Sequence, residues 1–477
     1  MKVQQKLFIG GTWRAASGDV DLVVTDSYTE GPLGKYRSAS RVDVDDAVHA
    51  ARAAFEGWSN ISLSERVAAI RRIAAALRER TDAISRVISN EVGMPLKLAA
   101  RIQSGGPIAA WDMYADLASQ IEWESRIGHS LVQQVPVGVV ACITPWNYPL
   151  HQVTGKVAPA LLAGCTVVLK PSEIAPSSAF LLADAIEQAN LPPGVFNLVH
   201  GTGSEVGEAL VTHPEVDMVS FTGSTRAGRR IAELAAQDIK RIALELGGKS
   251  AALVLPSADL QAAVKATLGG CFLNSGQTCS ATTRLLVPRD LVQAAANLAS
   301  EMASAWTMGD PTDPATRLGP LVSRTQLDKV RAMVDAALAA GAQRVTQEPL
   351  VPSQGYFFPP TVLANVTPDM PIAREEVFGP VLVLIAYDSV EEAITIANGT
   401  DYGLAATVWA ATPSEALPVA RRLRAGQVDV NGAPFNPQAP FGGFKRSGVG
   451  RENGRAGIEE FLEPVSLQLP SAFFETE

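Results

Sequence analysis

Short β-branched segments alternate with helical segments from residue 133 to residue 410, and this alternation restricts the fold more than any other feature. Strands separated by helices form βαβ units, and their crossover connections build mostly parallel sheets. The alternation repeats after Cys279, so the sequence predicts an α/β fold with a second α/β domain. The expected strands are 133–143, 166–169, 195–199, 216–221, 241–246, 250–255, 284–287, 381–385 and 405–410. The expected helices between them include one ending at 190, 226–236, 291–305, 325–340 and 390–398.

The N-terminal part is expected to be scaffold. Residues 7–13 predict a short strand and turn, and apolar residues at helical spacing predict a helix over 42–58. Ser62 and Glu65 form a capping-box pattern that predicts the start of the next helix. A further helical stretch is expected to reach about Leu117.

Composition limits the partners. A chain of 477 residues has room for two or three domains, and its net charge of −9 disfavours nucleic acid and anionic membranes. No apolar run approaches the roughly 18 residues that a membrane span needs. The first six residues lack the apolar core of a signal peptide, so a cytoplasmic location is expected.

Cysteine and histidine spacing argues against a metal site. The four cysteines form no C-x-x-C pair and the five histidines are scattered, so neither a zinc site nor a disulfide framework is expected. Four thiols in a reducing cytoplasm are most simply free. By that argument three of the cysteines are packing residues, and one can take part in a reaction.

Cys279 stands out among these thiols because its neighbours are polar. It ends the sequence Asn-Ser-Gly-Gln-Thr-Cys over residues 274–279, and Ser280 follows. A cysteine kept for packing usually has apolar neighbours, because a free thiol behaves as a small hydrophobe. This loop instead suits the presentation of a sulfur to a ligand.

Glycine-rich turns give weaker signals. The turn over 201–207 has one residue too many for a dinucleotide fingerprint, so a plain β–α turn is the preferred interpretation. The turn over 222–228 fits a phosphate-binding helix N-terminus and an ordinary Ser/Thr cap equally well. Residues 247–250 resemble the end of a P-loop, but they lead into a strand, so this possibility is rejected.

Five further segments allow a chemical and a structural interpretation. Lys170 and Glu173 at a strand end suit a nucleotide ribose or a surface turn. Asn147 lies between two prolines that fix its loop, which also fits a plain Pro-rich loop. Glu245 has apolar neighbours, so it is either a buried acid with a raised pKa or a residue on the solvent-exposed face of a strand. The loops 374–380 and 440–448 are either binding loops or turns.

Together these segments resemble the aldehyde dehydrogenase superfamily, whose members oxidise aldehydes to acids with NAD(P). The resemblance extends from about Phe8 to about Pro464. Its seven motifs occur in the family's order, and their combination is highly specific. They lie at 145–147, 170–173, 221–224, 244–249, 276–279, 375–380 and 440–443.

The resemblance implies a catalytic set. Cys279 would attack the aldehyde as a thiolate, and the Asn147 amide with the Cys279 backbone N–H would hold the oxyanion of the thiohemiacetal. After hydride transfer, Glu245 would activate the water that hydrolyses the thioester. Lys156 would have a supporting role near the site.

It also implies a cofactor set. The Glu173 carboxylate hydrogen-bonds a free 2′-hydroxyl and repels a 2′-phosphate, so NAD is favoured and NADP is the alternative. Lys170 and Glu173 would bind the adenosine ribose, Gly223 and Ser224 the pyrophosphate, and Glu376 with Phe378 the nicotinamide ribose and ring. The expected cofactor-binding residues are Thr144, Pro145, Trp146, Lys170, Ser172, Glu173, Gly223, Ser224, Leu246, Glu376 and Phe378.

The same resemblance places the wall of a substrate tunnel. None of its positions is Arg or Lys, which would suit a semialdehyde acid. Many relatives carry a bulky aromatic residue at the position of Gly155, so a wide tunnel for a neutral aldehyde, aromatic or branched, is expected. The expected wall residues are Tyr148, Gln152, Gly155, Thr278, Ser280, Phe435 and Phe441.

The family architecture implies three parts and a homodimer or homotetramer. A Rossmann-type cofactor domain would comprise 1–119 and 137–248, and a catalytic domain would comprise 249–455. A small β oligomerisation element would combine 120–136 with 456–477.

Four alternatives remain. A semialdehyde dehydrogenase of the same family differs only in substrate. A CoA-acylating relative needs no base, and Glu245 argues against it. Cys279, Asn147 and Glu245 together disfavour a catalytically silent binding or structural relative. A cysteine hydrolase needs a histidine base, for which His151 is the nearest candidate.

Overall fold

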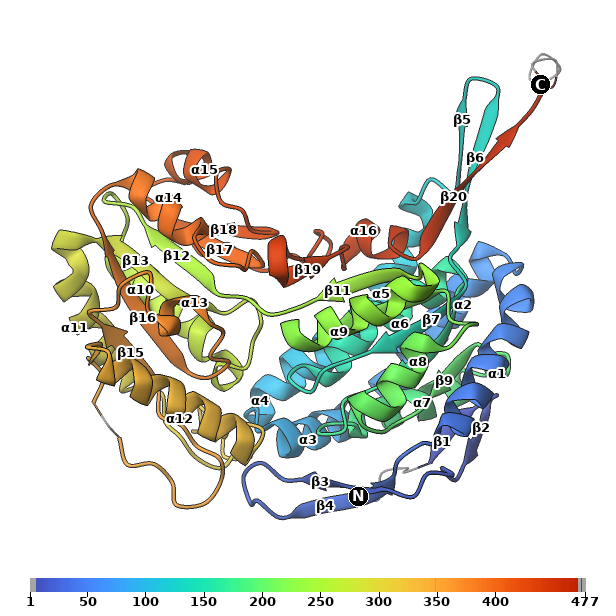
Figure 1. The fold of residues 1–477 in the computed structure, drawn as a ribbon, viewed down its shortest axis with the longest axis horizontal. Coiled ribbons are helices and arrows are strands. Elements are labelled where there is room, and N and C mark those ends of the chain that lie inside the picture. The colour runs from blue at the N-terminus through green and yellow to red at the C-terminus, as the bar shows by residue number, and fades with distance from the viewer. Residues whose placement is uncertain (1–5, 348, 471–472, 474–477) are drawn as a thin grey trace.

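The computed structural model describes residues 6–347, 349–470 and 473. Figure 1 shows two α/β lobes, one formed mainly by the first half of the chain and one by residues after β12 (Ser250–Val254). A long antiparallel arm projects from the first lobe, beside the C-terminal end. The strand–helix alternation expected from the sequence is therefore confirmed.

The first lobe is built on an eight-stranded sheet. Its order is β19-β11-β10-β7-β8-β9-β1-β2, and the five strands from β11 to β9 are parallel. The edges are antiparallel, because the hairpin β1–β2 closes one side and β19 the other. The strands are β1 (Leu7–Ile9), β2 (Thr12–Arg14), β7 (Val139–Ile143), β8 (Thr166–Lys170), β9 (Phe196–Leu198), β10 (Met218–Thr222), β11 (Arg241–Glu245) and β19 (Gly448–Val449).

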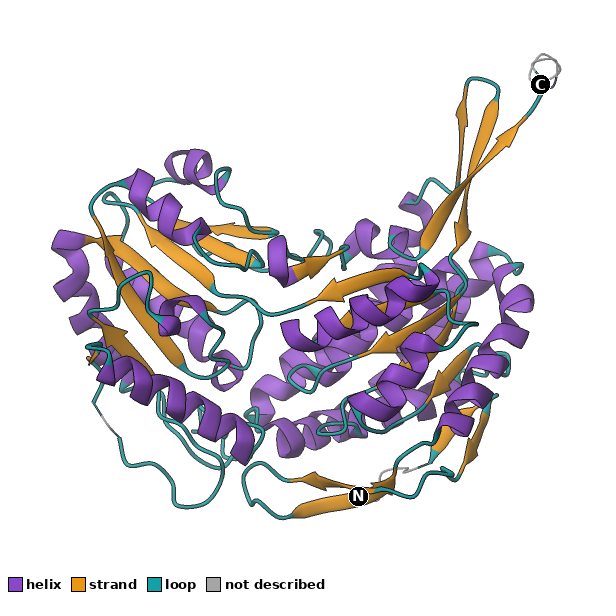
Figure 2. Cartoon of the chain, in the orientation of Figure 1, coloured by secondary structure: helices purple, strands orange, loops and turns teal. Residues whose placement is uncertain are grey.

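Helices cover both faces of this sheet (Figure 2). Alternate residues of β7 enter different apolar clusters, Val140 and Cys142 on one face and Ala141 and Ile143 on the other. A strand buried on both faces has no polar side, which explains its continuous apolar run. One face packs on α2 (Leu63–Arg78), α5 (Gly106–Leu117), α6 (Pro149–Ala163) and α7 (Ser177–Gln188). The other packs on α1 (Arg41–Ser59), α8 (Glu208–Thr212) and α9 (Thr225–Ala235).

The second lobe is a seven-stranded sheet of order β14-β15-β16-β13-β12-β17-β18, parallel except at β14. Its two faces also divide into separate apolar clusters. Its other strands are β13 (Thr282–Pro288), β14 (Gln343–Arg344), β15 (Thr361–Ala364), β16 (Val381–Tyr387), β17 (Ala405–Trp409) and β18 (Gln427–Val430). Its helices are α10 (Leu260–Phe272), α11 (Val292–Ala303), α12 (Arg324–Ala339), α13 (Pro371–Arg374), α14 (Val390–Asn398) and α15 (Pro413–Ala420).

The arm is a three-stranded antiparallel sheet in which the C-terminal strand pairs with β6 along its whole length. Its strands are β5 (Glu124–Ile127), β6 (Ser130–Pro136) and β20 (Leu462–Gln468). A separate hairpin joins β3 (Asp21–Thr25) to β4 (Pro32–Arg37). The remaining elements are α3 (Thr81–Val92), α4 (Leu96–Leu98), α16 (Gly454–Glu459) and the short helices 99–105, 118–120, 203–207, 236–238, 273–276, 289–291 and 445–447.

In the N-terminal part, the predicted capping box is confirmed, but the predicted helical stretch differs in part from the structure. Ser62 Oγ accepts from the Glu65 backbone N–H at 3.3 Å, and Glu65 Oε2 accepts from the Ser62 N–H at 2.9 Å, so the capping box is present. The helical stretch expected up to residue 117 is not one helix. It contains a π-helical segment over Ala99–Gly105, where Pro107 has no N–H to continue the α-helical ladder.

The topology of the first sheet predicts where a ligand binds. From β7 the chain adds β8 and β9 on one side, and then returns to add β10 and β11 on the other. Open parallel sheets bind ligands at the carboxyl ends of the strands where this reversal occurs. The loops that follow β7 and β10 therefore frame the expected cleft.

The turn that leads to Cys279 has an unusual backbone. Asn274, Ser275 and Gly276 all have positive φ, at 52°, 55° and 76°. A Cβ on Gly276 would collide with the Gly379 carbonyl. Non-glycine residues held in this region store strain, and such strain concentrates at functional sites.

We predict that Gly276→Ala destabilises the protein more than Gly341→Ala does. Both glycines have positive φ, but no atom lies within 4 Å of a Cβ at Gly341. Backbone strain of about 1–2 kcal/mol is expected at both positions, and overpacking adds about 1–3 kcal/mol at Gly276 alone. Thermal denaturation midpoints measure the difference, and equal midpoints would contradict the packing argument.

Candidate active site

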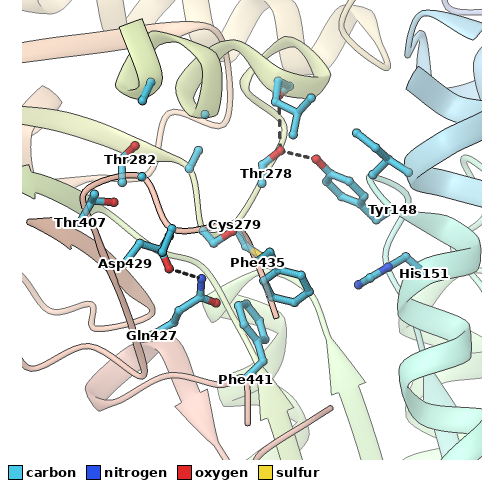
Figure 3. Close-up of a pocket in the computed structure, with 18 of the residues that line it drawn as sticks. Tyr148, His151, Thr278, Cys279, Thr282, Thr407, Gln427, Asp429, Phe435 and Phe441 are labelled. Carbon is cyan, nitrogen blue, oxygen red and sulfur yellow. Dashed lines mark hydrogen bonds between the residues drawn. The ribbon is translucent and has the colours of Figure 1, made fainter. Parts of the chain in front are cut away.

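Cys279 lines a cavity of about 840 Å³. It is half-buried, and Figure 3 shows it between Thr278, Phe435 and Phe441. The turn after α10 and the start of β13 fix its backbone from both sides. The presented thiol expected from the sequence is therefore a feature of the structure.

The environment of Cys279 favours the neutral thiol. Burial raises its pKa to about 12, and the carboxylates of Glu376 and Glu245 contribute in the same direction. The Ser280 backbone N–H opposes the shift. The other three thiols, Cys142, Cys165 and Cys271, are fully buried with their pKa also near 12, so Cys279 alone is placed to react.

Asn147 is fixed beside the cysteine loop. It is buried in the loop after β7, and its Nδ2 donates to the Gln277 carbonyl at 3.1 Å. Its own carbonyl accepts from Gln103 Nε2 at 2.8 Å and from Asn274 Nδ2 at 3.0 Å. The second N–H of the Asn147 amide has no partner among the described residues, so it remains available to an oxyanion.

Glu245 is buried, which excludes the alternative that it lies on the solvent-exposed face of a strand. Only 5% of it is exposed, and both carboxylate oxygens lack a hydrogen-bond partner in the described part of the chain. Burial raises its pKa well above the ordinary range, and the Glu452 carboxylate raises it further, against Lys156 and Arg451. A Cβ on Gly442 would lie 2.5 Å from Glu245 Oε1, so the glycine makes room for the acid.

Lys156 forms a buried ion pair with Glu452. The pair joins α6 to the segment between β19 and α16, 296 residues apart in sequence. Glu452 also lines the cavity, and its Oε2 would lie 3.3 Å from a Cβ on Gly155. The sequence did not identify Glu452, because no local pattern marks a partner so distant in the chain.

The expected cofactor residues gather at the strand ends of the first sheet and on one loop of the second lobe. Lys170 Nζ lies 3.2 Å from Glu173 Oε2, beside Ser172. Ser224 caps α9 by accepting from the Ala227 N–H at 3.2 Å. Glu376 Oε1 accepts from the Gly248 N–H at 3.0 Å. Thr144, Pro145, Trp146, Gly223, Leu246 and Phe378 occupy the loops between these groups.

The groups at this edge of the sheet suit a nucleotide cofactor. A Cβ on Gly223 would lie 2.4 Å from the Phe221 ring, and one on Gly247 would lie 2.6 Å from the Glu376 carboxylate, so the two glycines leave room for these side chains. The hydroxyl of Thr144 is buried without a partner in the described structure, and the N-terminus of α9 opens onto the same edge. Free N–H groups at a helix N-terminus suit a phosphate.

Two of the expected cofactor residues are aromatic and pack against each other. The rings of Trp146 and Phe378 meet edge to face at 5.4 Å, and Phe378 has a positive φ of 60°. A bulky residue with such a backbone is a genuine outlier, and outliers of this kind concentrate at ligand clamps.

Six of the seven expected tunnel residues line the cavity. They are Tyr148, Gln152, Thr278, Ser280, Phe435 and Phe441. Gly155 is not in the lining, and it faces Glu452 instead. The Tyr148 hydroxyl bonds Thr278 Oγ1 at 2.8 Å (Figure 3), and the rings of Tyr148 and His151 lie 6.2 Å apart. Unexpected polar lining residues include Arg101, His151, Thr407, Gln427, Asp429 and Glu452.

Two glycine turns take the structural roles expected of them. Residues 203–207 form a short π-helical turn between β9 and α8. Residues 247–249 lead into β12, as the rejection of a P-loop required. Neither turn forms the phosphate-binding motif that it partly resembles.

The geometry narrows the class of protein: an α/β fold places a thiol in a cavity wall, a buried amide bonded to the same loop and a buried acid that acts on the thiol. These groups lie in a fold whose parallel sheet is of the type that binds nucleotides at its strand ends. Comparison with known proteins makes the class specific. Residues 13–467 match the model of the aldehyde dehydrogenase family. The 3-succinoylsemialdehyde-pyridine dehydrogenase of a Pseudomonas species is 44% identical over 97% of this chain and 98% of that relative.

Solved structures agree. Aldehyde dehydrogenase C of Pseudomonas syringae, crystallised as a mutant with NAD+ and octanal, is 45% identical with a TM-score of 0.96, over 98% of this chain and 97% of that one. Betaine aldehyde dehydrogenase of Staphylococcus aureus with NAD+ is 35% identical with a TM-score of 0.94, over 98% and 94%. The chain belongs to the aldehyde dehydrogenase family, a family of oxidoreductases that act on aldehydes.

The described residues contain neither a helix suited to span a membrane nor a cluster suited to hold a metal ion. No helix combines the length and apolar character needed to cross a bilayer. No group of three or more His, Cys, Asp or Glu side chains in the described ranges is placed to hold a metal ion.

We predict that alkylation of Cys279 by iodoacetamide in the free enzyme rises about tenfold per pH unit from pH 7 to pH 9. The thiolate is the reactive species, and a pKa near 12 keeps it scarce over this whole range. Mass spectrometry of the alkylated peptide gives the rate, with Cys279→Ala as the background. A plateau below pH 8 would show that the thiol ionises far more readily than its surroundings imply.

Proposed function

We propose that the protein oxidises an aldehyde to the carboxylic acid with NAD, through a covalent intermediate on Cys279. The single observation that carries the proposal is the Cys279 thiol in the cavity wall, with the Asn147 amide bonded to the Gln277 carbonyl just before it and the buried Glu245 carboxylate near enough to raise its pKa. These three groups supply a nucleophile, an oxyanion donor and a base.

The first step is addition of the sulfur to the aldehyde carbon. A C–S bond forms, the carbonyl π electrons move to oxygen, and the thiol proton leaves. Because the pKa of Cys279 is near 12, little thiolate is present in the free protein, and the proton passes to solvent water as the sulfur adds. The free N–H of Asn147 and the Cys279 backbone N–H stabilise the oxyanion, and one such donor is typically worth about 2.7–4 kcal/mol.

The second step removes a hydride from the thiohemiacetal carbon and leaves a thioester. NAD, when bound, supplies the hydride acceptor. Glu376 and Phe378 would position the nicotinamide end, and the capped N-terminus of α9 the pyrophosphate. The Glu173 carboxylate favours a free 2′-hydroxyl, and the NAD+ in the solved relatives supports this choice over NADP.

The third step is hydrolysis of the thioester. Glu245 takes a proton from water, hydroxide attacks the carbonyl carbon, and the Cys279 sulfur leaves. A carboxyl with an ordinary pKa is a weak base, whereas burial raises the pKa of Glu245 towards the working range of an enzyme. Lys156 and Glu452 adjust this pKa in opposite directions, which is the supporting role we assign to Lys156.

The substrate is a neutral, fairly bulky aldehyde, aromatic or branched. A cavity of about 840 Å³ holds more than a short aliphatic aldehyde, and Tyr148, Phe435 and Phe441 offer aromatic walls. One relative's name specifies a pyridine-bearing semialdehyde and another was crystallised with octanal, so relatives take large aldehydes. A semialdehyde acid is the alternative substrate.

Rival activities have less support. A CoA-acylating enzyme needs no base, so the buried Glu245 argues against this activity. A catalytically silent relative would not need Cys279, Asn147 and Glu245 together. A cysteine hydrolase would use His151, whose imidazole burial keeps neutral and which makes no hydrogen bond to Cys279 among those described. The arm of β5, β6 and β20 supports assembly as a homodimer or homotetramer, and we place the protein in the cytoplasm.

The test is an aldehyde panel with NAD and NADP, repeated on Cys279→Ala. NADH absorbance should rise with benzaldehyde-type substrates, with a higher kcat/KM than for succinate semialdehyde, and NAD should exceed NADP. Cys279→Ala should lose at least about 10³-fold in kcat. Activity in Cys279→Ala, or a requirement for CoA, would overturn the mechanism, and a preference for succinate semialdehyde would overturn the substrate class.

A further inference from the structure

Arg101 lines the aldehyde cavity, and sequence patterns gave no sign of it. It lies in the π-helical segment Ala99–Gly105, which precedes Cys279 by more than 170 residues and belongs to the other lobe. Its side chain is exposed, whereas Ala99, Gln103 and Ser104 of the same segment are buried. A π-helical turn within a helix frequently marks a functional position.

The segment that carries Arg101 is tied to the catalytic loop. Gln103, two residues later, donates to the Asn147 carbonyl at 2.8 Å. Leu98 and Ile102 pack against a small cluster that contains Tyr148, a residue of the cavity wall. The backbone of Arg101 therefore has a fixed place relative to Asn147, while its side chain reaches the cavity.

The positive charge of Arg101 has no partner in the described structure. Its guanidinium makes no hydrogen bond, ion pair or ring contact with any residue that the structure describes. The other charged lining groups are engaged: Asp429 accepts from Gln427 at 2.9 Å, and Glu452 pairs with Lys156. No other Lys or Arg is among the described residues that line the cavity.

We propose that Arg101 is a specificity-determining residue that binds an oxygen or nitrogen acceptor at the end of the substrate remote from its aldehyde group. The inference rests on the proposed function and deepens it. The aldehyde group must reach Cys279 inside the cavity, so a long substrate extends its other end away from the sulfur. The planar guanidinium donates up to two parallel hydrogen bonds, which suits a carboxylate best and also a neutral carbonyl.

Two kinds of substrate share this chemistry. A neutral acceptor, such as an ester or a ketone, agrees with the neutral aldehyde proposed above. A carboxylate would move the enzyme to the semialdehyde class. Both gain from Arg101, whereas a plain alkyl aldehyde of equal length does not.

The experiment compares three series of aldehydes with six, eight and ten carbons: n-alkanals, ω-oxo carboxylates and their methyl esters. We expect wild-type kcat/KM to be about tenfold higher for the carboxylate or the ester than for the alkanal at one length or more, mainly through KM. Arg101→Met should remove this preference and leave the alkanals within about twofold. Arg101→Lys should keep part of the carboxylate preference, because it keeps the positive charge but loses the two parallel N–H donors of the guanidinium.

Lys97→Met is the matched control, because it removes an exposed cation just before the same segment at a residue that does not line the cavity. It should leave all three series unchanged. The proposal is overturned if Arg101→Met changes alkanals and acceptor substrates equally, or if wild type shows no acceptor preference at any length. Absence of NADH formation with every aldehyde, alkanals included, would instead refute the proposed function.

Discussion

The active site depends on one hydrogen bond, from the Asn147 amide to the Gln277 carbonyl. It joins the loop after β7 of the first lobe to the turn that presents Cys279 from the second. Gln103 and Asn274 both donate to the Asn147 carbonyl, so a buried polar network fixes the donor from two sides. The donors of this network are paired, whereas Gln103 Oε1 and Asn274 Oδ1 have no partner in the described structure, so the network orients the Asn147 amide without being fully satisfied.

Buried carboxylates set the chemistry around this network. Glu245 and Glu376 both raise the pKa of Cys279, and Glu452 raises the pKa of Glu245. Such like-charge neighbours favour the neutral forms of the Cys279 thiol and the Glu245 carboxyl in the free protein. Lys156 compensates part of the negative charge by pairing with Glu452.

The sequence predicted the elements well and the contacts between distant segments poorly. Strand–helix alternation gave the α/β lobes, and the capping box gave the start of α2, because both depend on near neighbours. The motif around Cys279 and the apolar flanks of Glu245 identified two site residues for the same reason. Glu452 and Arg101 carry no local signal, because only the fold brings them to the cavity. The division into domains at 119, 136, 248 and 455 remains a prediction.

The most direct test of the mechanism is mass spectrometry of Glu245→Gln mixed with an aldehyde and NAD. Without the base, hydride transfer should proceed once and hydrolysis should stall. We predict a burst of about one NADH per active site and an acyl group on the Cys279 peptide, with no adduct in wild type at steady state. Turnover of Glu245→Gln at the wild-type rate, or an NADH burst without acylated Cys279, would contradict the account.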